Sequence, residues 1–165
     1  MMRTHHSPVH THHPRRIMPT VASETCAAGT LRRATRSVAR LYDAHLAHAG
    51  LTTTQYSLLV SLDRRGGPVP LTELAEEQVF ERTSLYRALE PLRREGLIAL
   101  TAGPGRAKYA ALTPRGARRA AEARPHWQAA QDAFLGEFGR SAWSGLVKQL
   151  GDIVAAVRVI PTAGD

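Results

Sequence analysis

The feature that most constrains the fold is a pair of short helical stretches separated by a turn of about three residues. The first stretch runs over residues 71–78, and the turn is Val79-Phe80-Glu81. The second stretch repeats leucine at Leu85, Leu89 and Leu92, a spacing that places the three side chains on one face of an α-helix. The sequence therefore predicts two helices that pack against each other across a tight turn.

The segments that follow add a basic helix face and a hairpin. Gly96 ends the second helix, and two short apolar strands, 97–100 and 109–112, flank a turn that is rich in glycine. Helix, turn, helix and hairpin in this order predict a winged helix-turn-helix, whose second helix fits a DNA major groove about 12 Å wide. A lone charge run is usually a solvated surface, but here it occurs within the complete motif. The polar face of this helix carries Arg82, Thr83, Ser84, Tyr86, Arg87, Glu90, Arg93 and Arg94.

Further amphipathic helices are predicted on both sides of this core, which makes the fold mainly α (α+β). Thr52 and Gln55 have the spacing of a capping box, and Thr113-Pro114 is a typical helix start. Thr72 is the expected cap of the first short helix, and Pro125 is expected to kink the helix that contains it. The predicted helices span residues 23–49, 52–65, 113–138 and 141–160.

Composition limits the partners and the compartment. The 165 residues include 22 Lys and Arg against 14 Asp and Glu, a net charge of +8, which suggests a polyanionic partner. One cysteine excludes an intrachain disulfide framework and Cys-based zinc fingers. We find neither an apolar run long enough for a membrane span nor the apolar region of a secretory signal, and we expect a cytoplasmic protein without membrane contact.

The N-terminus differs from the rest of the chain. Residues 1–20 hold five of the eight histidines, three prolines, three arginines and no acid, so we expect a disordered basic arm. Its histidines are of a type that binds transition metals, but a solvated tail is the simpler explanation. We expect residues 21–165 to form a DNA-binding and dimerisation domain, with the winged helix core at about 51–113.

Three stretches resemble the MarR family of transcriptional regulators: LTTTQYSLLVSL, LTELAEEQVFERTSLYRALEPLRREGLI and GRAKYAALTPRGARRA. The resemblance spans about residues 24–158 and implies a homodimer, joined through helices from both chain ends, that reads a pseudo-palindromic operator in double-stranded DNA. It also implies a small-molecule or redox input near the dimer interface. Val79 replaces a frequent glycine, Glu81 replaces the usual Asp or Ser, and Pro104-Gly105-Arg106 lacks the usual wing acid.

The expected DNA contacts divide between bases and phosphates. We expect Ser84, Tyr86 and Arg87 to contact bases, because they follow the N-terminus of the second helix. Arg82 and Thr83 are expected to fix the register on phosphates. Two further cations, Arg106 and Lys108, lie at or just past the hairpin tip and are expected to contact the DNA backbone or the adjacent minor groove.

Three features are candidates for receiving a signal. The resemblance implies that three helical segments surround an effector cavity, and their aromatic and basic side chains would suit an aromatic acid or phenol. Packing at the dimer interface explains the aromatic side chains equally well. Cys26 in the first turn of a helix is either a reactive thiol or a small apolar residue buried at the dimer interface. His45 and His48, with His126, lack the thiol or carboxylate that would complete a metal site, so no metal is predicted. The effector-pocket candidates are Tyr42, His45, Tyr56, His126 and Trp127.

The sequence as a whole predicts a dimeric DNA-binding transcriptional regulator, a repressor that a small aromatic or phenolic ligand releases. One alternative is a redox-sensing regulator of the same fold that acts through Cys26. Another is a winged helix module for protein interaction or dimerisation, as found in methyltransferases. An enzyme would need a catalytic domain with a glycine-rich cofactor loop, which the roughly 20 residues outside the core do not supply. We therefore expect neither catalytic residues nor a cofactor.

Overall fold

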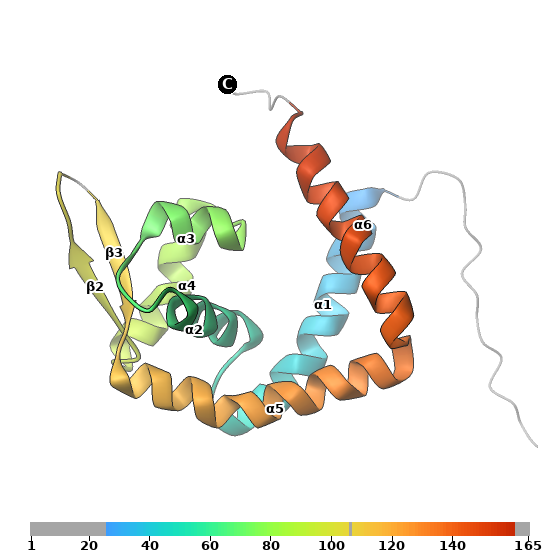
Figure 1. Cartoon of the computed structure of the whole chain (residues 1–165), viewed down its shortest axis with the longest axis horizontal. Coiled ribbons are helices and arrows are strands. Elements are labelled where there is room, and N and C mark those ends of the chain that lie inside the picture. The colour runs from blue at the N-terminus through green and yellow to red at the C-terminus, as the bar shows by residue number, and fades with distance from the viewer. Residues whose placement is uncertain (1–25, 106, 161–165) are drawn as a thin grey trace, which may run out of the picture.

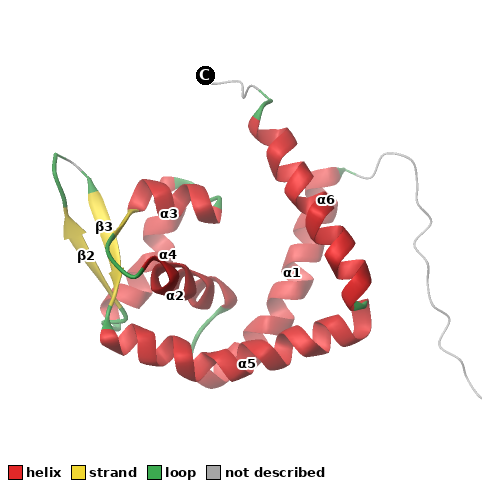
Figure 2. Ribbon diagram, in the orientation of Figure 1, coloured by secondary structure: helices red, strands yellow, loops and turns green. Residues whose placement is uncertain are grey.

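A computed structural model describes residues 26–105 and 107–160 of the chain. The described residues form six α-helices, one 3-10 turn and a three-stranded antiparallel sheet (Figure 1; Figure 2). None of these helices is both long and apolar enough to cross a membrane. The elements are α1 (Ala27–Leu46), η1 (Ala47–Ala49), α2 (Thr53–Arg65), β1 (Val69–Pro70), α3 (Leu71–Gln78), α4 (Arg82–Arg94), β2 (Ile98–Ala102), β3 (Lys108–Leu112), α5 (Pro114–Phe138) and α6 (Arg140–Arg158).

The lobe built from α2, α3, α4 and the sheet is organised around leucines. The α4 leucines Leu85, Leu89 and Leu92 are at most 1% exposed, as are Leu59 of α2 and Leu74 of α3. Fully burying one leucine contributes about 1.5–3 kcal/mol, so this cluster fixes how α4 is rotated about its own axis. The polar face of α4 is therefore held outward.

The sheet has the order β1-β3-β2 and forms the wing. Strands β2 and β3 pair from Ile98↔Leu112 to Ala102↔Lys108, and β1 adds the pairs Val69↔Ala110 and Pro70↔Tyr109. The wing is thus three-stranded at its base and two-stranded further out.

Helix α5 connects this lobe to α1 and α6 (Figure 1). Its buried side chains Ala120, Ala123 and Ala130 are small, which allows α1 and α2 to approach closely. The Asp43 carboxylate on α1 accepts hydrogen bonds from the backbone N–H and the hydroxyl of Thr53, both at 2.7 Å. This contact ties the end of α1 to the start of α2.

The predicted mainly helical winged helix fold is confirmed. The capping box of Thr52 with Gln55 is present, and the Thr113 hydroxyl accepts a hydrogen bond from the N–H of Gly116. The prediction that Thr72 caps α3 is wrong, because α3 begins at Leu71 with Pro70 as N-cap. Helix α5 continues as a single helix through Pro125.

The sheet differs in extent from the prediction. Strands β2 and β3 reach Ala102 and Lys108, and the two-residue β1 was not predicted. The N-terminal arm predicted at residues 1–20 lies outside the described residues.

Gly116 is required by close packing at the start of α5. A Cβ atom at this position would overlap the carbonyl oxygen of Leu97, which is backbone and has no room to move. We expect Gly116→Ala to lower the free energy of unfolding by about 1–3 kcal/mol. Gly136→Ala, in the same helix but with nothing within 4 Å of the added Cβ, should raise it by about 0.5–1 kcal/mol. Urea unfolding of both variants tests this, and equal effects would contradict the packing argument.

Candidate nucleic-acid interface

The exposed face of α4 is polar and positively charged along its N-terminal half. Arg82, Thr83, Ser84 and Arg87 are all exposed. Neither Arg82 nor Arg87 forms an ion pair within the described part of the chain, whereas Arg93, near the end of α4, pairs with Glu90 at 2.7 Å. The first two turns of α4 therefore present guanidinium groups and hydroxyls to a ligand outside the chain.

The turn that leads into α4 is strained. Val79 is the C-cap of α3 and has φ 54° and ψ 45°, a left-handed conformation that is unfavourable for a β-branched residue. The backbone N–H of Phe80 donates to the carbonyl of Ala75 at 2.8 Å and closes the turn. Glu81 is the N-cap of α4, but its side chain makes no capping hydrogen bond. Both residues were departures from the family pattern, and both lack the local fit that glycine or a short polar residue provides.

The wing places the ammonium group of Lys108 beside α4. Lys108 is exposed at the start of β3, and its Nζ lies 5.6 Å from the centre of the Tyr86 ring. A cavity of about 260 Å³ lies between the wing and α3–α4, and Arg82, Tyr86 and Lys108 are among its lining residues. The structure therefore brings three of the predicted DNA-contacting residues together. Arg106, the other wing cation, lies outside the described residues.

Helix α3 is held against α2 by a charged network centred on Glu77. The carboxylate of Glu77 accepts a hydrogen bond from the buried Ser61 hydroxyl at 2.6 Å and pairs with Arg64 at 2.7 Å and Arg65 at 3.3 Å. The Ser61 hydrogen bond, followed by the two guanidinium groups, holds the pKa of Glu77 below its usual value. Glu77 is therefore ionised at neutral pH and links α3 to α2.

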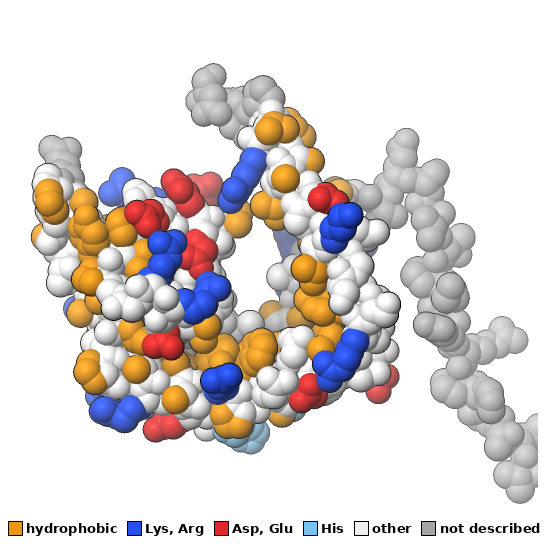
Figure 3. Space-filling view, viewed as in Figure 1, with side chains coloured by type: hydrophobic (Ala, Val, Ile, Leu, Met, Phe, Trp, Pro, Cys, Tyr) orange, Lys and Arg blue, Asp and Glu red, His pale blue; other side chains and the backbone are white. Residues whose placement is uncertain are grey.

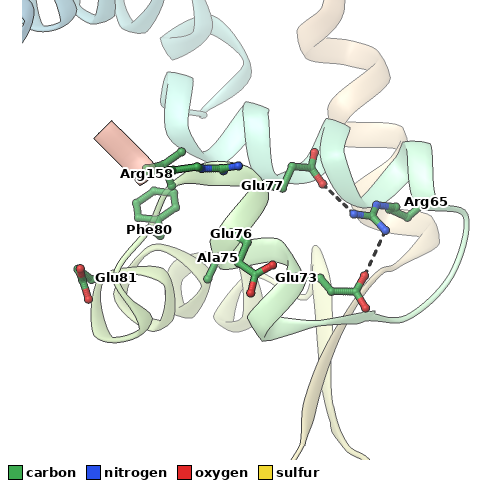
Figure 4. A pocket seen from close by; sticks show the side chains of 9 residues that line it. Arg65, Glu73, Ala75, Glu76, Glu77, Phe80, Glu81 and Arg158 are labelled. Carbon is green, nitrogen blue, oxygen red and sulfur yellow. Dashed lines mark hydrogen bonds and ion pairs between the residues drawn. The ribbon is translucent and has the colours of Figure 1, made fainter. Parts of the chain in front are cut away.

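A second cavity separates α3 from the end of α6. Its volume is about 730 Å³, and four acidic side chains and two arginines line it, together with Phe80 of the turn (Figure 4). Arg65 bridges Glu73 and Glu77 on one wall, and Arg158 of α6 reaches in from the opposite side. This cavity was not predicted from the sequence, because its lining residues come from segments that are far apart in the chain.

The predicted effector residues lie where α1, α2 and α5 meet. Tyr42 is buried and its hydroxyl donates to Gln131, and burial raises its pKa. Tyr56 is also buried and stacks on Trp127 with ring centres 6.2 Å apart; burial raises its pKa, and Arg124 opposes this. Neither of the two cavities described above is lined by these residues.

The predicted histidines and the thiol are also placed by the fold. The rings of His48 and His126 stack with centres 5.4 Å apart, and His45 is half-buried on α1. No group of three His, Cys, Asp or Glu side chains within residues 26–105 and 107–160 is arranged to hold a metal. Cys26 precedes α1 and is exposed on the single chain.

A helix-turn-helix with a basic outer face and an adjacent wing defines the winged helix class of DNA-binding regulators. The transcriptional regulator MosR of M. tuberculosis is 33% identical, with a TM-score of 0.73 over 84% of this chain and 100% of MosR. MosR in complex with DNA is 34% identical, with a TM-score of 0.71 over 82% of this chain and 100% of that chain.

Two further solved structures are similar over most of the chain. The MarR family regulator Sco5413 of Streptomyces coelicolor is 26% identical, with a TM-score of 0.69 over 82% of this chain and 96% of Sco5413. The repressor CouR bound to p-coumaroyl-CoA is 26% identical, with a TM-score of 0.68 over 78% of this chain and 91% of CouR. No protein-family model and no curated sequence matches the chain. The chain belongs to the MarR family of transcriptional regulators.

The strain at Val79 predicts a stabilising substitution. A left-handed conformation costs a non-glycine residue about 1–2 kcal/mol, and glycine loses about 0.5–1 kcal/mol more backbone entropy on folding. We therefore expect Val79→Gly to raise the free energy of unfolding by about 0.5–1 kcal/mol. Glu76→Gly, at an exposed helical position three residues earlier, should lower it by about 1 kcal/mol. Thermal unfolding distinguishes the two, and a destabilised Val79→Gly would show that the side chain contributes packing that outweighs the strain.

Proposed function

We propose that the chain is a homodimeric repressor that binds a pseudo-palindromic operator and is released by a small aromatic ligand. The observation that carries this proposal is the unpaired, exposed guanidinium and hydroxyl set on the first two turns of α4, beside a wing. Within it, Ser84 and Arg87 contact base edges, and Arg82 and Thr83 contact phosphates. Lys108 and Arg106 extend the contact from the wing, and residues 51–113 form the DNA-binding core.

An apolar stripe on α6 supports the dimer. The exposed fractions are 48% for Val147, 43% for Val154 and 60% for Val157, and no residue of α6 is buried. The apolar side chains of α6 are visible in Figure 3 as a band along the helix. A contiguous apolar surface of this kind is typical of an interaction site. A second copy of the chain covers it through α1, α5 and α6, which also sets the distance between the two recognition helices.

The junction of α1, α2 and α5 supports the aromatic ligand. Tyr42, Tyr56 and Trp127 surround this junction, with His45 and His126 nearby. The structurally similar repressor CouR was solved with p-coumaroyl-CoA, a phenolic thioester. A ligand that separates Tyr56 from Trp127 would move α2 relative to α5, and α2 carries the leucines on which α4 rests.

The DNA-binding proposal is tested at Arg87. We expect Arg87→Ala to weaken binding to a duplex that the wild type selects from a random library by about 1–3 kcal/mol, and to flatten the preference at one base pair. Arg94→Ala is the matched control, because Arg94 is also exposed on α4 and forms no ion pair among the described residues, but lies beyond the first two turns of the helix. Binding to single-base variants of the selected duplex is the measurement. An unchanged preference profile would remove Arg87 from the base-reading residues.

A second candidate input is oxidation of Cys26, which its exposure favours. The two inputs are separated by titrating p-coumarate, p-coumaroyl-CoA and peroxide against DNA complexes of the wild type and Cys26→Ser. We expect an aromatic ligand to release both proteins equally, because the substitution lies outside the proposed pocket. Release of the wild type alone by peroxide would instead support the redox-sensing regulator. If the aromatic compounds release neither protein, the proposed ligand class is wrong.

A further inference from the structure

The wing and the recognition helix are joined by a side-chain contact between Lys108 and Tyr86. The Nζ atom of Lys108 lies 5.6 Å from the centre of the Tyr86 ring, within the range of a cation–π interaction. Lys108 is exposed, whereas Tyr86 is half-buried and packs against the leucine core. The core therefore fixes Tyr86, whereas Lys108 belongs to the part of the sheet that has only two strands.

The backbone alone does not hold Lys108 in place. Lys108 pairs with Ala102 on β2. Strand β1 does not reach this far toward the wing tip, because its last pair with β3 is Pro70↔Tyr109. Beyond that point the wing is a two-stranded hairpin, which is only marginally stable by itself. The cavity of about 260 Å³ separates this part of the wing from α3 and α4. The Tyr86 ring therefore bridges a gap that the backbone leaves open.

We propose that Tyr86 is a positioning residue that acts on DNA through Lys108, rather than through its own hydroxyl. This inference rests on the proposed function. The ring holds the ammonium group at the junction of α4 and the wing. With α4 in the major groove and the wing at the adjacent minor groove, the phosphate backbone between the two grooves passes this junction. A lysine side chain loses up to about 2 kcal/mol of rotamer entropy when it is fixed. Because the ring already restricts Lys108 in the free protein, part of this cost is removed before DNA binds.

Two substitutions of Tyr86 should differ in their effect on DNA affinity. Tyr86→Phe keeps the ring and removes the hydroxyl, so DNA affinity and base preference should stay within about twofold of the wild type. Tyr86→Leu removes the ring and should weaken binding about two- to fivefold, the range expected for an exposed cation–π contact. The loss should be equal on the selected duplex and on a scrambled duplex of the same length, because a phosphate contact carries no sequence information.

Substitutions of Lys108 complete a double-mutant cycle with those of Tyr86. Lys108→Met should weaken binding to both duplexes and reduce the salt slope by about one unit, whereas Lys108→Arg should restore both. The double variant Tyr86→Leu/Lys108→Met should bind as Lys108→Met does, because the ring has no ammonium left to position. Losses that multiply in the double variant, or a Tyr86→Phe defect confined to the selected duplex, would overturn the inference.

A measurement without DNA separates this inference from the proposed function. In free protein, the ε-methylene protons of Lys108 should be shifted upfield by the Tyr86 ring in the wild type and in Tyr86→Phe, but not in Tyr86→Leu. Urea unfolding of Tyr86→Leu verifies that its core remains folded, and Lys108→Met tests the same contact without altering the core. A wild type that selects no duplex contradicts the proposed function. A wild type that selects one without an upfield Lys108 signal contradicts only the positioning role of Tyr86.

Discussion

The structure depends on the burial of the α4 leucines against α2 and α3. Leu85, Leu89 and Leu92 leave water almost completely, and a rotation of α4 that exposed even one of them would cost about 1.5–3 kcal/mol. That cost is a large fraction of the stability of a small domain. The same three residues therefore decide which side chains of α4 point outward, and the proposed DNA-reading face is a consequence of the core.

The scaffold around this lobe is held by contacts of a different kind. Small residues on α5 allow α1 and α2 to pack closely, and Asp43 with Thr53 fixes the connection between those helices. Helix α6 has no buried residue, so its apolar stripe is left exposed on the single chain. The cavity between α3 and Arg158 lies between these two parts.

Features with a local cause could be predicted from the sequence. Leucine spacing predicted the helices, Thr52 was predicted as a cap from Gln55 three residues later, and Thr113 from the proline that follows it. Thr72 was misread because a threonine near a helix start resembles a cap, whereas the chain already turns at Pro70. Strand β1 escaped notice because two residues carry no periodic pattern, and they pair only because β3 lies beside them.

The candidate site divides in the same way. The exposure of Arg82 and Arg87 follows from the period of the helix, so the sequence was sufficient for it. The stacking of Tyr56 on Trp127 and the approach of Lys108 to Tyr86 join segments that are far apart in the chain, and neither leaves a signal in a single sequence. The strain at Val79 could be predicted only in part. The family resemblance showed that glycine is frequent at this position, but the left-handed backbone angles came from the structure.

The central claim is that two copies of the α4 face act together on one duplex. The most direct measurement is the stoichiometry and footprint of the wild type on the duplex that it selects. We expect two protomers per duplex and protection of two symmetric half-sites with centres about 34–36 Å apart, with an affinity that falls steeply as salt rises. One protomer on a single asymmetric site, or binding that does not change with salt, would contradict it.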